Sequence, residues 1–133
     1  MEITVVKEFT FDAAHFLPNH PGKCKNMHGH TYKLQIGLKG KIYPDTGMVL
    51  DFGHIKTYVQ DFIIDIMDHK LLNDITPGNN FPTEQPTAER MVVWIVQVLK
   101  GLFPIANTEK LSFVRLYETP TSWAEWREEN AAS

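Results

Sequence analysis

The only cysteine of the chain, Cys24, stands four positions before a His-Gly-His motif that contains His28 and His30. The motif opens a run in which apolar and polar residues alternate, the pattern of a half-buried β-strand. Residues two apart on a strand point to the same side, so both imidazoles can reach one metal ion. The stretch therefore carries residue types suited to metal binding, to nucleophilic chemistry, or to both.

A third histidine, His15, follows the first predicted strand and completes a possible ligand set. Three neutral imidazoles suit Zn²⁺, and three protein ligands that leave one position open are typical of catalytic zinc. The alternative is that these histidines satisfy only local hydrogen bonds, which we accept for His20 and His54. For His15, His28 and His30 together we expect a zinc site.

Cys24 lies between Lys23 and Lys25, whose positive charges would favour a thiolate that could act as a base or nucleophile. Two other interpretations stay open. Cys24 could be a buried apolar residue, which the neighbouring Pro21 and Gly22 argue against. It could also be the fourth ligand of a closed structural zinc site.

Three acidic positions could also do chemistry. Asp68 and His69 form an acid-base pair at the end of a predicted helix, although a charged helix end explains them equally well. Glu118 shares a strand face with apolar residues, so we expect it to be buried and to need a partner, such as the N–H edge of a guanidine-like ligand. Glu89 stands in the first turn of a helix, where a negative charge is stabilising without any function.

Four strands are expected to position these side chains. Alternation and β-branched residues predict them over residues 3–11, 28–40, 111–119 and, after Pro120, 121–127. Turn residues at 43–47, followed by a short apolar run, would fold residues 30–52 into a hairpin. Residues 13–27 are predicted to be loop.

Two amphipathic helices are predicted between the strand pairs. One runs from Ile55 to Met67, and the other, capped by Thr87, runs from Met91 to Leu102. The loop between the helices contains Pro77, Gly78, Pro82 and Pro86. The order β-β-α-α-β-β predicts an α+β fold, with an antiparallel four-stranded sheet and both helices on one face.

Composition predicts one soluble globular domain over residues 1–133. With 43% hydrophobic residues the chain can bury a core, and a net charge of -3 with scattered cations argues against nucleic-acid binding. No apolar run approaches the length of a membrane span, so we expect no membrane partner. A single cysteine fits a reducing compartment, and we expect a cytoplasmic protein.

Six motifs together resemble the 6-pyruvoyl-tetrahydropterin synthase family, in order and along nearly the whole chain. They are FDAAHFLP, CKNMHGHTYKL, MVLDF, DHKLLND, PTAE and LYETPTSWAEW. Within the family the chain looks like the bacterial branch that forms 6-carboxy-tetrahydropterin for queuosine. The three residues between Cys24 and His28 favour that branch, because the pyruvoyl branch of animals tends to have a longer insertion.

The resemblance implies a tunnelling fold, in which the sheets of several identical subunits join into a barrel with the helices outside. It implies a homo-oligomer, expected to be a hexamer, whose active sites lie between subunits. Zinc on the three histidines is implied as well. The implied catalytic residues are Cys24, Asp68 and His69, with Glu118 anchoring the pterin and Thr87 and Glu89 near its ring.

The implied reaction converts 7,8-dihydroneopterin triphosphate into 6-carboxy-tetrahydropterin, acetaldehyde and triphosphate. Zinc would polarise the side-chain hydroxyls, and the cysteine and histidine would move protons. Lys23 and Lys25 could meet the triphosphate or could simply be solvated. A pyruvoyl-type synthase and a non-enzymatic module that binds zinc or a pterin are the alternatives.

Overall fold

The computed structural model describes residues 1–76, 79–105 and 109–129. Within these ranges a five-stranded sheet has the order β3-β1-β2-β4-β5. Its bounds are β1 (Ile3–His15), β2 (His28–Gly40), β3 (Lys70–Leu71), β4 (Lys110–Thr119) and β5 (Ser122–Arg127). The four long strands pair antiparallel, whereas β3 runs parallel to β1 at the edge. The predicted α+β fold and its antiparallel sheet are confirmed, with a fifth, short strand added.

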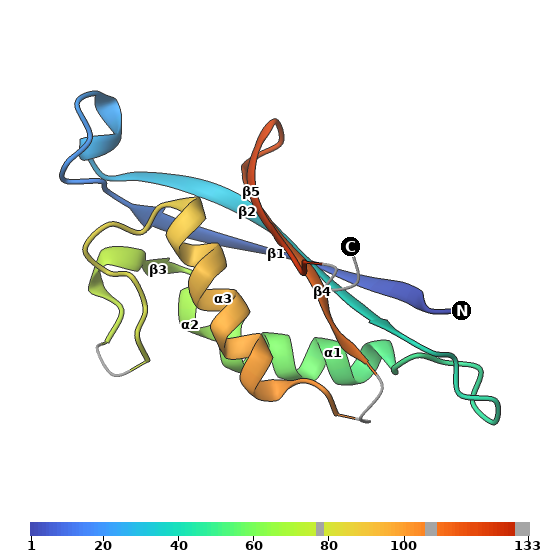
Figure 1. Ribbon diagram of the computed structural model, residues 1–133. Helices are drawn as coiled ribbons and strands as arrows, with labels where there is room; N and C mark the ends of the chain where they lie inside the picture. Colours follow the sequence, from blue (N-terminus) through green and yellow to red (C-terminus); the bar gives the residue numbers. More distant parts are fainter. Residues whose placement is uncertain (77–78, 106–108, 130–133) are drawn as a thin grey trace.

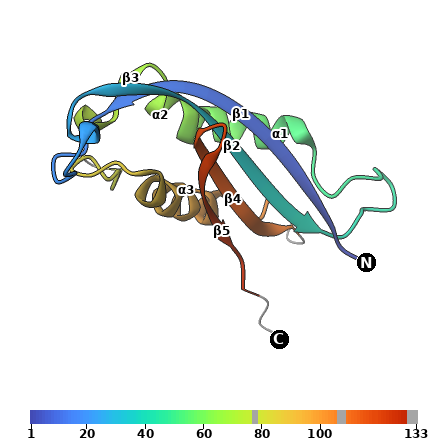
Figure 2. The same ribbon diagram turned by 90° about the horizontal axis from the view of Figure 1, so that it is seen from above.

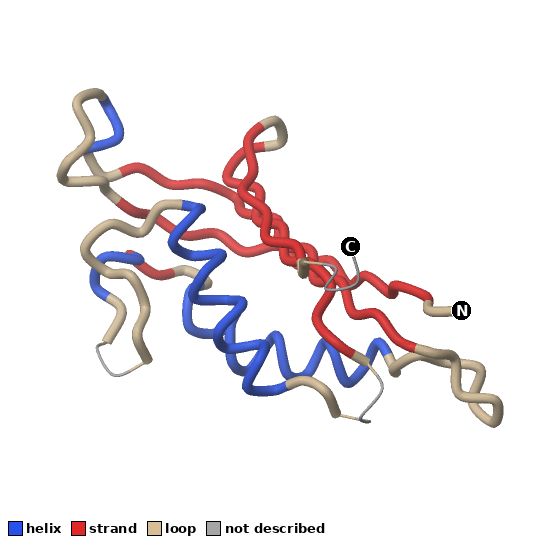
Figure 3. The backbone as a smooth tube through the Cα atoms, viewed as in Figure 1, coloured by secondary structure: helices blue, strands red, loops and turns tan. Residues whose placement is uncertain are grey.

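Both long helical segments lie on one face of the sheet, as predicted (Figures 1 and 2). The first is continuous and consists of α1 (Phe52–Val59), a π-helical turn (Gln60–Ile64) and α2 (Asp65–Met67). The second is α3 (Ala88–Leu102). Figure 3 shows a further short helix in each of two loops, which are single 3-10 turns at Lys23–Lys25 and Leu72–Asp74. No helix in the described part of the chain is long and apolar enough to cross a membrane.

The core fills the space between the sheet and the helices. Alternate residues of the central strands point to this side, here called the helix face. They pack against buried residues of both helical segments, and the largest fully buried side chains are Tyr32, Leu34, Ile36, Leu38, Ile55, Ile63, Met67, Leu72, Met91, Ile95, Leu99 and Leu116. The other side of the sheet, here called the open face, carries the intervening polar residues.

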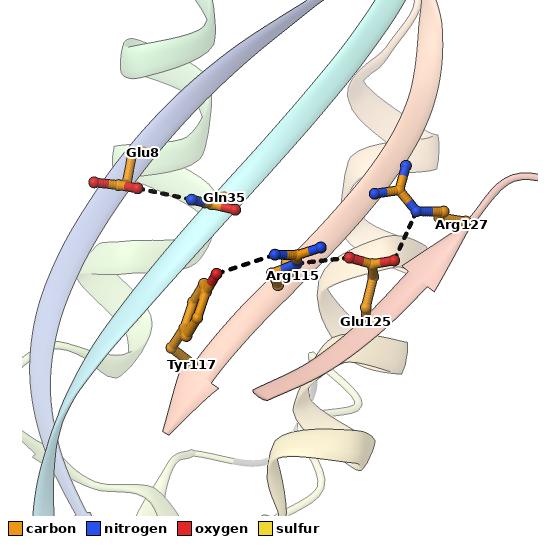
Figure 4. A network of polar contacts seen from close by, with 6 residues as sticks. All are labelled: Glu8, Gln35, Arg115, Tyr117, Glu125 and Arg127. Atoms are coloured by element: carbon orange, nitrogen blue, oxygen red, sulfur yellow. Dashed lines mark hydrogen bonds and ion pairs between the residues drawn. The ribbon is translucent and has the colours of Figure 1, made fainter. Parts of the chain in front are cut away.

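The open face is held by cross-strand polar contacts rather than by a second layer (Figure 4). Glu125 of β5 accepts hydrogen bonds from Arg115 (2.6 Å) and Arg127 (2.7 Å), and Arg115 also donates to the Tyr117 hydroxyl (3.0 Å). On the central pair, the side-chain amide of Gln35 donates to Glu8 at 2.8 Å. These contacts link β1 to β2 and β4 to β5 on the open face.

The predicted hairpin over residues 30–52 is wrong. The partner of β2 is β1, which lies antiparallel to it from Ile3 opposite Gly40 to His15 opposite His28. Residues 48–50 form no strand, and Asp51 instead caps α1 by accepting a hydrogen bond from the Gly53 N–H at 2.7 Å. Residues 13–15, predicted as loop, belong to β1.

The first helix buries most of its predicted apolar stripe, and Phe62 is the exception. Phe62 was expected to face the core but is 46% exposed, whereas Ile64 is buried. The π-helical turn explains the difference, because it accommodates one additional residue per turn and shifts the buried row. In α3 the expected cap is confirmed, since the Thr87 hydroxyl accepts a hydrogen bond from the Arg90 N–H at 3.2 Å. Pro77 and Gly78 of the predicted loop lie outside the described residues.

Gly37 of β2 is required by close packing on the open face. A Cβ atom at this position would lie 2.3 Å from the Phe113 ring, far inside van der Waals contact. We predict that Gly37→Ala lowers the free energy of unfolding by about 1 to 3 kcal/mol, the usual cost of overpacking, measured by urea denaturation. Gly101→Ala is the control, because nothing lies within 4 Å of its Cβ position. Equal stability of the two variants would contradict this packing argument.

Candidate metal centre and active site

The pairing of β1 with β2 brings three histidines together. His15, the last residue of β1, lies directly opposite His28, the first residue of β2. His30 follows two residues later and therefore shares the helix face with His28. The glycine between them adds no side chain to the open face. His15 was predicted to lie in a loop but belongs to the strand. Its expected proximity to His28 and His30 is confirmed.

The three imidazoles point their ring nitrogens at a common centre. One nitrogen from each lies within 4.8 Å of the others. The ring centroids are 4.6 Å apart for His15 and His28, 4.9 Å for His28 and His30, and 5.2 Å for His15 and His30. Such a cluster matches the size of a coordination sphere, in which Zn–N bonds are about 2.0 to 2.1 Å long.

Backbone carbonyls determine which nitrogens face the centre. Nδ1 of His15 donates to the Pro86 carbonyl at 2.8 Å, and Nδ1 of His28 donates to the Asn26 carbonyl at 2.7 Å. Each Nε2 therefore keeps its lone pair, and the two Nε2 atoms lie only 3.0 Å apart. Two lone pairs at this distance repel one another unless a cation lies between them. Carbonyl contacts of this kind orient metal-binding histidines in proteins.

The third imidazole leaves a buried acceptor without a hydrogen bond. Nε2 of His30 has no hydrogen-bond partner among the described residues. Glu118 Oε1 is the nearest ion-pair partner at 3.5 Å, which is too long for a hydrogen bond. A buried nitrogen left this way costs stability unless a ligand occupies it. The chemistry of the group thus fits a bound metal ion.

Burial favours the neutral form that binds metals for two of the imidazoles, those of His15 and His30. It lowers the pKa of His15, against the opposing effects of the Pro86 carbonyl and of Glu118. It also lowers the pKa of His30, where the Glu118 carboxylate again opposes it. Both side chains therefore offer lone pairs at neutral pH, and little proton competition is expected there.

Glu118 lies beside the three-histidine group, and the prediction that its side chain is buried is wrong. Its side chain is 28% exposed, because it lies near the end of β4, past the last residue of that strand paired with β2. It lines a hollow of about 390 Å³ together with Glu89 and residues of β5, including Trp123. Thr87 and Glu89 lie at the start of α3, next to the Pro86 carbonyl that holds His15. The carboxylate is thus accessible to a ligand.

Cys24 lies in the 3-10 turn of the loop that joins β1 to β2. Its side chain is half-buried, and its carbonyl accepts a hydrogen bond from the Leu17 N–H at 2.8 Å, which closes the loop. The ligand atoms that gather within 4.8 Å of one another belong to the three histidines and do not include its sulfur. The geometry gives no support to a closed site with cysteine as fourth ligand.

Asp68 and His69 are in contact, which their adjacency in sequence does not guarantee. His69 Nδ1 lies 2.9 Å from Asp68 Oδ1, and the imidazole is 77% exposed. The pair follows α2 at the edge of β1. His69 lines a hollow of about 420 Å³ with the open-face residues Asp12 and Thr31. Within one chain the pair therefore faces the side of the sheet opposite to the three histidines.

Two polar groups near these sites were not predicted from the sequence. The Pro86 carbonyl is a backbone atom that no residue pattern reveals. The Tyr32 hydroxyl is buried below the histidines without a hydrogen-bond partner among the described residues, and its ring is 5.6 Å from that of His30. Its position two residues after His30, on the same strand face, was the available signal.

Comparison with known proteins agrees with the family resemblance. The sequence profile described as 6-pyruvoyl tetrahydropterin synthase matches residues 4–129. A 6-carboxy-5,6,7,8-tetrahydropterin synthase of Haemophilus influenzae is 40% identical, over 93% of this chain and 98% of its own length. A 6-pyruvoyl tetrahydrobiopterin synthase of Pongo abelii is 37% identical over 74% of this chain and 66% of its own length. The structure of Caenorhabditis elegans 6-pyruvoyl tetrahydropterin synthase superposes with a TM-score of 0.83 at 26% identity, over 97% of both chains.

We predict that the purified protein binds about one transition-metal ion per chain and that the three histidines hold it. His28→Ala should lose the metal, because it removes one of only three ligands. Cys24→Ala should keep it, because its sulfur is outside the group of ligand atoms. Elemental analysis after dialysis measures both variants. Metal loss from the cysteine variant would contradict the three-histidine site.

Proposed function

Because the chain belongs to the 6-pyruvoyl tetrahydropterin synthase family, we propose that it converts 7,8-dihydroneopterin triphosphate into 6-carboxy-5,6,7,8-tetrahydropterin, acetaldehyde and triphosphate, for queuosine biosynthesis. The carboxy-type product is supported by relatives with that name that align over nearly the whole chain. The observation that carries the proposal is the three-histidine group with Glu118 beside it. Together they provide a metal centre next to an accessible carboxylate.

The metal in this proposal is zinc, held by His15, His28 and His30. Three imidazoles are a typical ligand set of catalytic zinc, which leaves one position for a substrate oxygen, and backbone carbonyls fix the tautomers of His15 and His28. Bound there, zinc would supply Lewis acidity toward the hydroxyl groups of the substrate side chain.

Glu118 would bind the pterin ring. A carboxylate pairs well with two parallel N–H groups, and the amino-pyrimidine edge of a pterin presents such a pair. The hollow that contains Glu118 has a volume of about 390 Å³, enough for a bicyclic ring. Thr87 and Glu89 would lie near the ring at the start of α3. This placement would bring the substrate side chain toward the three histidines.

Cys24 and the Asp68–His69 pair would move protons. In its thiolate form, the half-buried Cys24 on the loop beside the histidines could take a proton from the substrate side chain and become the thiol. The exposed His69 can give or take another, while Asp68 fixes its tautomer through the 2.9 Å contact. Each group would act at a carbon or oxygen of the side chain, and the ring would stay anchored on Glu118.

The complete site would form between subunits of a homo-oligomer, expected to be a hexamer. In one chain, the histidine group lies on the helix face and His69 lines a hollow on the open face. Because the side chains of the two groups lie on opposite faces of the sheet, we expect His69 of a neighbouring chain to serve as the acid-base group. The chain would act as one domain over residues 1–133, in the cytoplasm.

We predict that the metal-loaded protein forms acetaldehyde and a carboxypterin from 7,8-dihydroneopterin triphosphate, identified by mass spectrometry. Glu118→Gln should raise KM about 10-fold or more, the loss expected when a charge-assisted contact is weakened. It should keep the metal and melt no earlier than the unmodified protein. A pyruvoyl product would select the alternative synthase activity. Binding of the pterin without turnover would select a non-enzymatic module.

We predict that inactive Cys24→Ala and His69→Ala chains complement each other. When the two are co-expressed with different tags and the mixed oligomers are isolated, some sites combine the intact cysteine of one chain with the intact histidine of another. Activity should return well above that of either variant alone. If each site were contained in one chain, every site would carry a defect, and mixed oligomers would be no more active than either variant.

A further inference from the structure

Asp12 lies beside the Asp68–His69 pair and has no role in the mechanism proposed above. Its main chain holds the pair from both sides: its N–H donates to Asp68 Oδ1 at 3.0 Å, and its carbonyl accepts from the His69 N–H at 2.6 Å. His69 has a φ of 59°, in the left-handed region that non-glycine residues seldom adopt. The two hydrogen bonds secure this unusual turn against the edge of β1.

The side chain of Asp12 is also directed at the pair. One of its carboxylate oxygens lies within 4.8 Å of both a ring nitrogen of His69 and an oxygen of Asp68. The Thr31 hydroxyl on β2 donates to Asp12 Oδ1 at 2.5 Å, a short charge-assisted hydrogen bond. The carboxylate is thus held in place rather than free to turn into solvent.

Two carboxylates this close repel each other unless a cation lies near both. The other charged or titratable residues of the hollow are His69, Lys70 and His30, and Lys70 follows His69 directly in sequence. His69 is the group within reach of both carboxylates. Two carboxylates within reach of one imidazole can fix its orientation, and negative charge beside an imidazole favours its protonated form in general.

We propose that Asp12 is a positioning residue for His69: oriented by Thr31, it acts with Asp68 as a second carboxylate that holds the imidazole and stabilises it after it has taken a proton. The proton-transfer part rests on the proposed function. The positioning part rests on the hydrogen bonds of Asp12 and on the proximity of its carboxylate to His69.

Glu8 provides a matched control on the same strand and face. Its carboxylate accepts a hydrogen bond from Gln35 of β2 at 2.8 Å, a cross-strand contact like that of Asp12 with Thr31 (Figure 4). It lies four residues from Asp12 and outside the hollow of His69. Glu8→Gln therefore tests the loss of an open-face carboxylate without affecting the pair.

The experiment compares purified oligomers of Asp12→Asn, Asp12→Glu, Thr31→Val and Glu8→Gln with the unmodified protein. Asp12→Asn should lower kcat about 10-fold and leave KM and metal content unchanged. Removal of a partner that orients a functional group typically lowers activity about 10- to 100-fold. Asp12→Glu should restore most of kcat, and Thr31→Val should give an intermediate loss. Glu8→Gln should match the unmodified protein.

A second measurement needs no substrate. In protein labelled with ¹⁵N-histidine, NMR of the ring nitrogens reports tautomer and hydrogen bonding, and the His69 signals should move in Asp12→Asn but stay in Glu8→Gln. Unchanged His69 signals and kcat in Asp12→Asn would overturn the proposal, as would equal losses in Asp12→Asn and Glu8→Gln. If neither the unmodified protein nor any variant forms product, the proposed function is wrong. A change in the His69 signals of Asp12→Asn would still support the positioning role in that case.

Discussion

The register between β1 and β2 is the constraint on which the rest of the structure depends. It sets His15 opposite His28 and, two residues on, brings His30 to the same face. A slip of one residue would turn one strand's histidines to the open face and break the ligand set. The core prevents that slip, because Phe11 lies opposite Tyr32 on the helix face and the two rings stack with their centroids 4.9 Å apart. Core packing and the grouping of the three histidines therefore require the same register.

β1 positions chemistry on both faces of the sheet at once. The odd-numbered residues of β1, which include His15, lie on the helix face. Its even-numbered residues, which include Asp12 beside His69, lie on the open face. The backbone of Asp12 also forms the edge to which the Asp68–His69 pair is bound. A single strand thus holds groups on opposite faces of the sheet, which is the physical reason why the proposed function places the complete site between two subunits.

Local patterns predicted the fold class, the helices, the faces of the long strands and the proximity of three histidines. They failed where the outcome depended on distant partners or on a local departure from regular helix geometry. Residues 30–52 resemble a hairpin locally, but β2 gains a longer pairing with β1. Phe62 fits a regular helical stripe, and only the π-helical turn moves it outward. The role of Asp12 was not predicted, because Asp68 and Thr31 become its neighbours only through the sheet and its edge.

The residues around the metal centre are less favourable for stability than the core that supports them. Nε2 of His30 and the hydroxyl of Tyr32 are buried without hydrogen bonds among the described residues, and each such group costs about 1 to 3 kcal/mol. A leucine or phenylalanine at either position would avoid that cost and continue the apolar row of β2. Local conflicts of this kind are expected where a sequence specifies a functional site rather than a stable fold. Their concentration at one end of the strand pair, beside Glu118, supports the proposed position of the active site independently of any family resemblance.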